Sequence, residues 1–263
     1  MNLIDSHAHL DLKEFDSDRK DVLKRAKEAG LVHIITIGIN VESSARAIDL
    51  AAKNDFISAT VGFHPHDAKS LTPAGLDRLR DLGRSEQVVG FGEIGLDFFR
   101  NLSPHHLQEK AFDDLIHLGL ELDLPLIIHD REAHQKIYSH LSAVRSSLKR
   151  GVIHCFSGDY NLARRFLDLG FHLSIPGTIT FPKAETLRRV VAKVPLESIL
   201  LETDCPFLAP APKRGKRNEP ALIRFTAAEL ARIKGVSVEE VAAITTAAVR
   251  SLFKLPEPPR SGL

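Results

Sequence analysis

The chain has 263 residues, 43% of them hydrophobic, so it can bury a large core, and its net charge of +1 neither favours nor excludes nucleic acid as a partner. Two cysteines without CxxC spacing, Cys155 and Cys205, exclude a disulfide framework, and the longest mainly apolar stretch, residues 31–39, is too short to span a membrane. The N-terminus shows no secretory segment, so we expect a cytoplasmic protein with no membrane or obligate protein partner.

Short apolar, β-branched segments alternate with longer segments of helical periodicity along the chain. We predict eight strands, at residues 2–7, 32–38, 57–63, 88–93, 125–129, 151–155, 171–175 and 198–203. We predict eight helices between and after them, at residues 17–30, 43–53, 74–84, 105–123, 132–143, 159–169, 184–193 and 219–233. A last helix at 237–252 has Ser237 as its N-cap, and Glu240 completes a capping box.

This alternation predicts an α/β fold, a (β/α)8 TIM barrel with an extra C-terminal helix. A doubly wound open sheet would use the same alternation, but the chain length, the strand number and the lack of a GxGxxG turn favour the barrel. No shift in composition divides the chain. We therefore expect one barrel over residues 1–255, followed by a Pro-rich, loosely ordered tail at 256–263.

Side chains that bind metals stand at the predicted ends of five strands. They are His7 and His9 on the first strand, Glu93 on the fourth, His129 on the fifth, His154 on the sixth and Asp204 on the eighth. The carboxyl ends of barrel strands meet on one rim, so these residues are expected to converge. Each has an ordinary explanation alone, as a hydrogen-bonded rim residue or turn residue. Their joint occurrence predicts a site for two divalent cations, bridged by a carboxylate.

The alternation of side chains along a strand predicts which neighbours of these ligands face the site. Glu202 shares a face with Asp204, and Asp5 shares a face with His7, so both are expected to orient ligands or water from below. A role as buried polar residues satisfied by core hydrogen bonds explains them equally well. Cys155 falls on the face opposite His154, which predicts a packing residue rather than a ligand.

Basic and aromatic residues near the same rim suggest a phosphate-containing substrate. Arg131 and Arg100 follow two of the strand ends, and the loop at 213–218 carries Lys213 and Arg214, although a solvated surface turn also explains that loop. Five phenylalanines lie near the predicted mouth: Phe63, Phe98, Phe99, Phe156 and Phe207. A nucleobase can stack on such rings, but we expect at least three of them to pack the top of the barrel.

Seven segments carry a resemblance to a known family: DSHAHLD (5–11), GFHP (62–65), GEIGLD (92–97), IHDREA (128–133), HCFSG (154–158), LETDCP (201–206) and GKRNEP (215–220). In this order they resemble the TatD family of metal-dependent deoxyribonucleases, within the amidohydrolase superfamily. The resemblance implies a TIM barrel that hydrolyses DNA, often as a 3′→5′ exonuclease, with Zn²⁺, Mn²⁺ or Mg²⁺.

The resemblance also implies a set of residue roles. One metal would be held by His7, His9, Glu93 and Asp204, and the second by Glu93, His129 and His154. Arg131, His64 and Asn218 fall where the family contacts its substrate.

We therefore expect phosphodiester hydrolysis at the ends of single-stranded DNA, with RNA as a further possible substrate. Asp204 is the candidate proton acceptor, Glu93 the bridge, and His64 the candidate donor to the leaving oxygen. Histidine-rich ligation favours Zn²⁺ or Mn²⁺ over Mg²⁺. The alternatives are a hydrolase of a small amide, lactone or aminoacyl ester, in which the same metals polarise a carbonyl, and a barrel that binds without catalysis.

Overall fold

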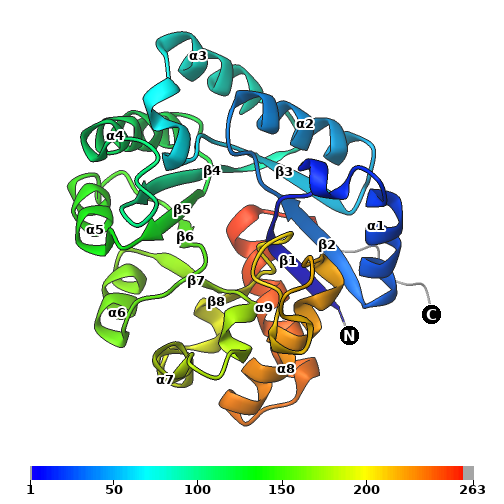
Figure 1. Ribbon diagram of the computed structural model, residues 1–263. Helices are drawn as coiled ribbons and strands as arrows, with labels where there is room; N and C mark the ends of the chain where they lie inside the picture. The colour runs from blue at the N-terminus through cyan, green and yellow to red at the C-terminus, as the bar shows by residue number, and fades with distance from the viewer. Residues whose placement is uncertain (1, 257–263) are drawn as a thin grey trace.

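The structure is a computed structural model, and it describes residues 2–256. Eight parallel strands follow one another around a single sheet in chain order, which gives a nearly closed barrel (Figure 1). The strands are β1 (Leu3–Ala8), β2 (Leu31–Thr36), β3 (Ile57–Val61), β4 (Val88–Asp97), β5 (Leu126–Arg131), β6 (Gly151–Ile153), β7 (Phe171–Ile175) and β8 (Ile199–Leu201).

Helices surround the barrel and connect each strand to the next (Figure 1). They are α1 (Arg19–Glu28), α2 (Val41–Ala52), α3 (Pro73–Leu82), α4 (His105–Glu121), α5 (His134–Ala143), α6 (Tyr160–Asp168), α7 (Glu185–Lys193), α8 (Ile223–Lys234) and α9 (Val238–Phe253). Short 3-10 turns lie at Lys13–Phe15, Pro65–Ser70, Gly177–Thr180, Leu196–Ser198, Ala211–Lys213 and Pro220–Leu222. Side-chain caps begin several helices; the predicted cap of α9 is present, since Ser237 Oγ accepts the Glu240 N–H at 3.1 Å.

The barrel closes where the first strand meets the last. β1 is joined to the chain after β8 through an isolated bridge between Ala8 and Cys205. Two backbone hydrogen bonds flank it, from His9 N–H to Cys205 O at 2.8 Å and from Asp204 N–H to His7 O at 2.9 Å. The closure of the barrel therefore lies at the carboxyl ends of the strands, beside the residues that the sequence places there.

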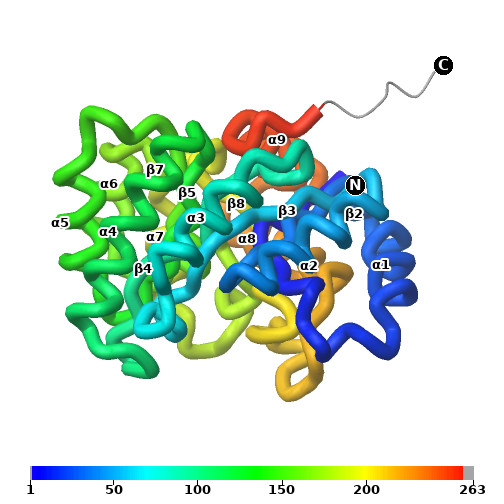
Figure 2. The backbone as a smooth tube through the Cα atoms, turned by 90° about the horizontal axis from the view of Figure 1, so that it is seen from above, coloured from blue at the N-terminus to red at the C-terminus, as the bar shows by residue number. Residues whose placement is uncertain are grey.

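The apolar core has two parts. The larger part lies between the strands and the surrounding helices. The smaller part joins strand residues such as Ile4, Ile127 and Leu200 to Leu252 and Phe253 of α9. Figure 2 shows α9 across one end of the barrel and the loop after β8 at the other. Helix α9 thus closes the amino end of the barrel with apolar side chains and leaves the opposite rim free.

The predicted fold class is confirmed, and the predicted elements match the observed ones within a few residues. One difference matters for the site: β4 continues to Asp97, so Glu93 lies inside the strand and not at its end. Within residues 2–256, no helix is long and apolar enough to cross a membrane. The predicted tail lies, apart from Pro256, outside the described residues, and the division at residue 255 stays a prediction.

Candidate metal centre

A pocket of about 480 Å³ opens at the carboxyl ends of the strands. Ionisable side chains from β4, from β5 and from the segments that follow β1, β3, β6 and β8 line it, together with two arginines and two phenylalanines. These lining residues include His9, His64, His66, Glu93, Asp97, His129, His154, Asp204, Arg100, Arg131, Phe99 and Phe207. The structure therefore brings together residues that are up to 200 positions apart in the chain, and it buries His7 directly below them.

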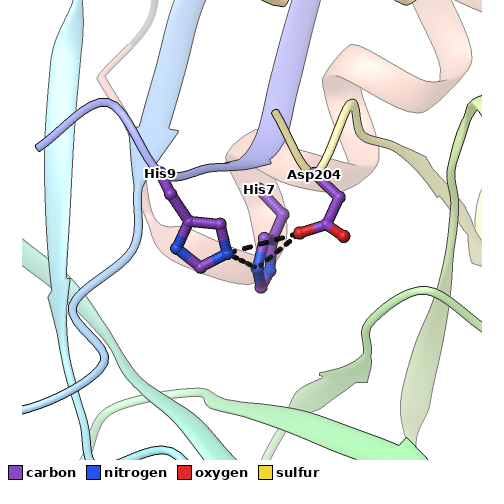
Figure 3. A group of neighbouring side chains, drawn as sticks. All are labelled: His7, His9 and Asp204. Atoms are coloured by element: carbon purple, nitrogen blue, oxygen red, sulfur yellow. Dashed lines mark hydrogen bonds and ion pairs between the residues drawn. The ribbon is translucent and has the colours of Figure 1, made fainter. Parts of the chain in front are cut away.

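Four donor atoms face one another in the first group, from β1 and the segment after it, from β4 and from the loop after β8; Figure 3 shows part of this group. His7 Nε2 and His9 Nε2 are 3.3 Å apart. Asp204 Oδ1 lies 3.7 Å from His7 Nε2 and 3.3 Å from His9 Nε2. Glu93 Oε2 lies 3.3 Å from His7 Nε2 and 3.7 Å from His9 Nε2. The donor atoms of His7, His9 and Asp204 thus all lie within 4.8 Å of one another, and Glu93 Oε2 lies beside the two histidines.

These separations fit a divalent cation. In tetrahedral coordination with bonds of about 2.1 Å, ligand atoms are about 3.4 Å apart. Five of the separations in this group lie close to that value. Two imidazole nitrogens and two carboxylate oxygens are also the donors that Zn²⁺ and Mn²⁺ accept. The first group therefore fits a metal by both its geometry and its chemistry.

The second group surrounds the other oxygen of the same glutamate. Glu93 Oε1 lies 2.6 Å from His129 Nδ1, 3.0 Å from His154 Nε2 and 3.5 Å from His64 Nε2. Glu93 comes from the middle of β4, where the pairing with β5 shifts register between Phe91 and Ile94. A bulge of this kind re-aims a side chain, and here it directs the carboxylate between the two groups. One carboxylate facing two sets of donors is the arrangement of a bridging ligand.

Charges within the centre are strongly coupled. Burial alone would raise the pKa of Glu93, but His154, His64 and His129 hold it well below its usual range. Burial opposes protonation of His129, but its hydrogen bonds to Asp97 and Glu93 prevail and raise its pKa to about 9. Burial lowers the pKa of His64 to about 4. Glu93 is therefore ionised near pH 7, as metal ligation requires, whereas His129 must lose a proton to bind a cation.

Asp97, which we did not single out from the sequence, belongs to this centre. Its Oδ2 accepts hydrogen bonds from His66 Nε2 at 2.8 Å and from His129 Nε2 at 3.2 Å. Its Oδ1 accepts the N–H groups of Phe99 and Arg100, which fixes the start of the loop after β4. A carboxylate on the outer nitrogen of a ligating histidine sets the tautomer and the direction of the ring. The GEIGLD segment contained the signal, because Asp97 lies four residues beyond Glu93.

Glu202 and Asp5 are both fully buried beneath the centre, and they act on different groups. Glu202 Oε1 accepts the Cys155 N–H at 2.8 Å and lies 3.4 Å from His154 Nδ1. Asp5 binds backbone instead, since it accepts the N–H groups of Thr203 and His7 and the Thr203 hydroxyl. Burial raises the pKa of Asp5 to about 7. Glu202 thus contacts an imidazole, whereas Asp5 positions the two chain segments that carry His7 and Asp204.

The expectation that Cys155 faces away from the site is wrong, because it lines the pocket. The residue follows β6 and has a left-handed backbone with φ of 47°, which ends the strand alternation on which the expectation rested. Asp204 has a similar backbone, with φ of 56°. Left-handed non-glycine residues are uncommon and concentrate at functional sites. Cys205, in contrast, is fully buried in the core, as a packing residue would be.

The expected substrate contacts separate into two sets. Arg131 and Arg100 line the pocket, and the Arg131 guanidinium lies 5.0 Å from the centroid of the Phe99 ring. Lys213 and Arg214 are exposed and are not among the described residues that line the pocket. The Arg214 guanidinium stacks on Phe181 instead. The positions of Lys213 and Arg214 therefore do not support the expectation that they bind the substrate phosphate.

Asn218 also lies away from the pocket. Its side chain is fully buried and donates to Thr203 O at 2.8 Å and to Phe207 O at 2.6 Å, so it holds the loop after β8 in place. The neighbouring Arg217 is bound by Asp18, which accepts from both of its terminal nitrogens. Partners so distant in the chain could not be inferred from the sequence of this loop. Asn218 therefore shapes the pocket wall that carries Asp204 and Phe207.

Comparison with known proteins agrees with this architecture. Residues 4–254 match the family model described as TatD related DNase. A Bacillus subtilis protein named as an uncharacterized metal-dependent hydrolase, YabD, is 38% identical, covering 96% of this chain and 99% of its own. A Pantoea ananatis protein named 3′-5′ ssDNA/RNA exonuclease TatD is 37% identical, covering 96% of this chain and 100% of its own.

A solved structure shows the same fold. The crystal structure of YJJV, a TatD homologue from Escherichia coli, matches with a TM-score of 0.92 at 34% identity, over 97% of this chain and 98% of that one. The family match over nearly the whole chain, together with relatives of this identity, settles membership. The chain belongs to the TatD-related family of metal-dependent hydrolases.

Proposed function

We propose that this protein is a two-metal phosphodiesterase that removes nucleotides from the ends of single-stranded DNA in the 3′→5′ direction. One observation carries the proposal: Glu93 directs one oxygen at each of two donor groups, 3.3 Å from His7 Nε2 and 2.6 Å from His129 Nδ1. Two arginines beside those groups supply positive charge for a phosphate. Relatives at similar identity are named 3′-5′ ssDNA/RNA exonucleases, which supports a nucleic-acid substrate.

The proposed ligands follow the donor groups. His7, His9, Glu93 and Asp204 would hold one cation, and Glu93, His129 and His154 would hold the second. Divalent cations bound there would polarise the phosphate and make an attacking water more acidic. The histidine-rich donor set favours Zn²⁺ or Mn²⁺ over Mg²⁺. The cytoplasmic location expected from the sequence stays a prediction.

The chain's own residues have separate tasks in this proposal. Asp204 Oδ1 belongs to the first donor group, and the second oxygen of this carboxylate accepts the proton of the attacking water. Arg131 binds the phosphate oxygens, in which charge grows in the transition state. His64 borders the second group; its ring is neutral near pH 7 because burial lowers its pKa to about 4, so it donates a hydrogen bond to the leaving oxygen.

The test is digestion of 3′- and 5′-labelled single-stranded DNA and RNA across a series of Mn²⁺, Mg²⁺ and Zn²⁺. We expect mononucleotide release from the 3′ end, and Asp204→Asn should lower kcat far more than it weakens strand binding. A panel of amides, lactones and aminoacyl esters serves as the comparison. If the protein cleaves members of that panel and no labelled strand, the carbonyl hydrolase replaces the nuclease. If it binds strands and cleaves neither class, the proposal fails.

A further inference from the structure

Two exposed aromatic rings stand at the mouth of the metal centre. Among the described residues, the large hydrophobic side chains with high exposure are Phe99 at 54%, Leu102 at 53% and Phe207 at 50%. Phe99 and Phe207 line the pocket, whereas Leu102 does not. Exposed apolar groups gathered at a polar pocket are typical of a binding surface.

The other aromatic residues expected at this mouth are packed, as predicted for at least three of the five. Phe63 and Phe156 are buried, and the Phe98 ring is half-buried and stacks on His105 with centroids 3.9 Å apart. The protein therefore packs three of its rim phenylalanines against other side chains and leaves two exposed. Packing in the core therefore does not explain why Phe99 and Phe207 are at this rim.

Phe207 is fixed to the first donor group. Its ring lies edge-on to His9 with centroids 6.0 Å apart, and its N–H donates to Asp204 O at 2.9 Å. Asn218 holds the Phe207 carbonyl from the other side. The ring thus keeps a set position relative to the donor atoms of His9 and Asp204.

Phe99 is fixed to the second donor group through Asp97. The Phe99 N–H donates to Asp97 Oδ1 at 3.0 Å, and Asp97 Oδ2 in turn accepts from His129. The Arg131 guanidinium lies 5.0 Å from the ring centroid, so a cation stands beside this ring. One exposed aromatic ring therefore belongs to each donor group, and Glu93 lies between the two.

We propose that Phe207 and Phe99 each stack on one unpaired nucleobase, one on either side of the phosphate that lies over Glu93. This inference rests on the proposed function and defines its substrate as a frayed, unstacked dinucleotide end. Every base has an aromatic face, so stacking tolerates any sequence. Bases within a duplex already stack on their neighbours and are paired, so they present no free face to the rings. The preference for single strands follows from the two rings.

The test compares enzyme variants and modified strands in one matrix. The variants are Phe99→Ala and Phe207→Ala, with Leu102→Ala as the matched control because it is equally exposed and lies outside the pocket lining. The strands are single-stranded oligonucleotides of equal length that carry an abasic nucleotide at the last or the next-to-last position, or no change. We expect each alanine variant to lose about 10-fold in kcat/KM on the intact strand. Each variant should then lose nothing further when its own base is removed.

A binding measurement makes the test independent of turnover. A strand with 2-aminopurine at either of the two terminal positions is titrated with protein in the presence of a chelator. Stacking on a phenylalanine quenches this fluorescence, so we expect quenching by the wild type and by Leu102→Ala. Phe207→Ala and Phe99→Ala should each abolish quenching at one position and keep it at the other.

The outcomes separate this inference from the proposed function. If the wild type cleaves labelled strands but the alanine variants match Leu102→Ala on every strand and in quenching, base stacking is wrong and the nuclease stands. If the wild type cleaves no strand but quenches 2-aminopurine in a Phe-dependent way, the rings bind bases and the proposed reaction falls. If it neither cleaves nor quenches, both fall.

Discussion

The two ends of this barrel are built from opposite kinds of side chain. At the amino end, Ile4, Ile127 and Leu200 pack against Leu252 and Phe253 of α9. At the carboxyl end, the same strands or their immediate continuations carry His7, His129 and Glu202. A strand of six residues thus changes from an apolar contact to an ionisable one along its length. The comparison teaches that stability and chemistry occupy different ends of the same strands, so each can be altered separately.

The largest effect is expected from Glu93→Gln, which breaks the carboxyl end. The amide keeps the shape of the side chain but has one oxygen, whereas the carboxylate has two oxygens that share a negative charge. The amide therefore cannot offer an oxygen to both donor groups. We expect the loss of metal-dependent activity by more than about 100-fold and fewer bound metal ions per chain, measured by elemental analysis.

With chelator present, the unfolding temperature should also fall in this variant, because His154, His64 and His129, which hold the pKa of Glu93 low, lose their charged partner. Glu93→Gln protein with wild-type turnover and metal content would remove Glu93 from the bridge.

The converse experiment breaks the amino end. Phe253 is buried against β-strand residues beneath the barrel, so Phe253→Ala should lower the free energy of unfolding by about 3–5 kcal/mol. Turnover per folded molecule should stay close to that of the wild type. Denaturant unfolding measures the loss, and Phe99→Ala is the control, because removing an exposed phenylalanine should change stability by less than about 0.5 kcal/mol. A large loss of turnover in Phe253→Ala would show that the two ends are coupled.

A smaller effect should follow from Asp97→Asn, which leaves every donor atom in place. The substitution weakens the hydrogen bond from His129 Nε2, so the ring loses its fixed direction. We expect metal affinity to fall by about 10- to 100-fold, measured by competition with a chelator of known affinity. His66→Ala is the comparison, since His66 shares Asp97 Oδ2 but has no donor atom in the metal groups. An equal loss in His66→Ala would show that the orientation of His129 is not the cause.

The smallest effect concerns Asp18, which ties the loop after β8 to the segment before α1. Hydrogen bonds from Arg217 are the main cause that lowers the pKa of Asp18 from 3.8 to about 2. A carboxyl group with a lowered folded-state pKa stabilises the fold above its unfolded pKa, and that contribution disappears as the pH falls through the folded value.

The unfolding temperatures of the wild type and Asp18→Asn should therefore differ at pH 5 and converge as the pH falls from about 4 to 2. A difference that stays constant over this range would exclude ionisation of Asp18 as the source.

Much of this fold follows from local pattern. The alternation of strands and helices, the Ser237 cap and the count of eight strands were all visible in the sequence. The gathering of His7, His129 and His154 followed from one geometric rule, that strand ends in a barrel share a rim. That rule needs only the order of the strands, so it succeeds without any knowledge of side-chain contacts.

Other features depend on contacts that no local pattern reveals. Asp97 escaped notice because β4 continues past Glu93 through a register shift. Cys155 was placed on the wrong face because its left-handed backbone ends the alternation. Asn218 looked like a substrate contact, but its partners are the carbonyls of Thr203 and Phe207. The roles of these three residues were missed for a common reason: each residue lies at a bulge, a strand end or a loop, where the backbone departs from regular strand geometry. Such irregular segments form much of the site.

The seam between β1 and the chain after β8 has a consequence for how the molecule holds together. The residues beside the Ala8–Cys205 bridge are His7, His9 and Asp204, which supply three of the four donor atoms of the first group. A cation coordinated by these three residues would crosslink the first strand of the chain to a segment almost 200 residues later. Ion binding would then reinforce the backbone hydrogen bonds that already join the two segments, and amide exchange at His9 and Asp204 would slow when the ion binds.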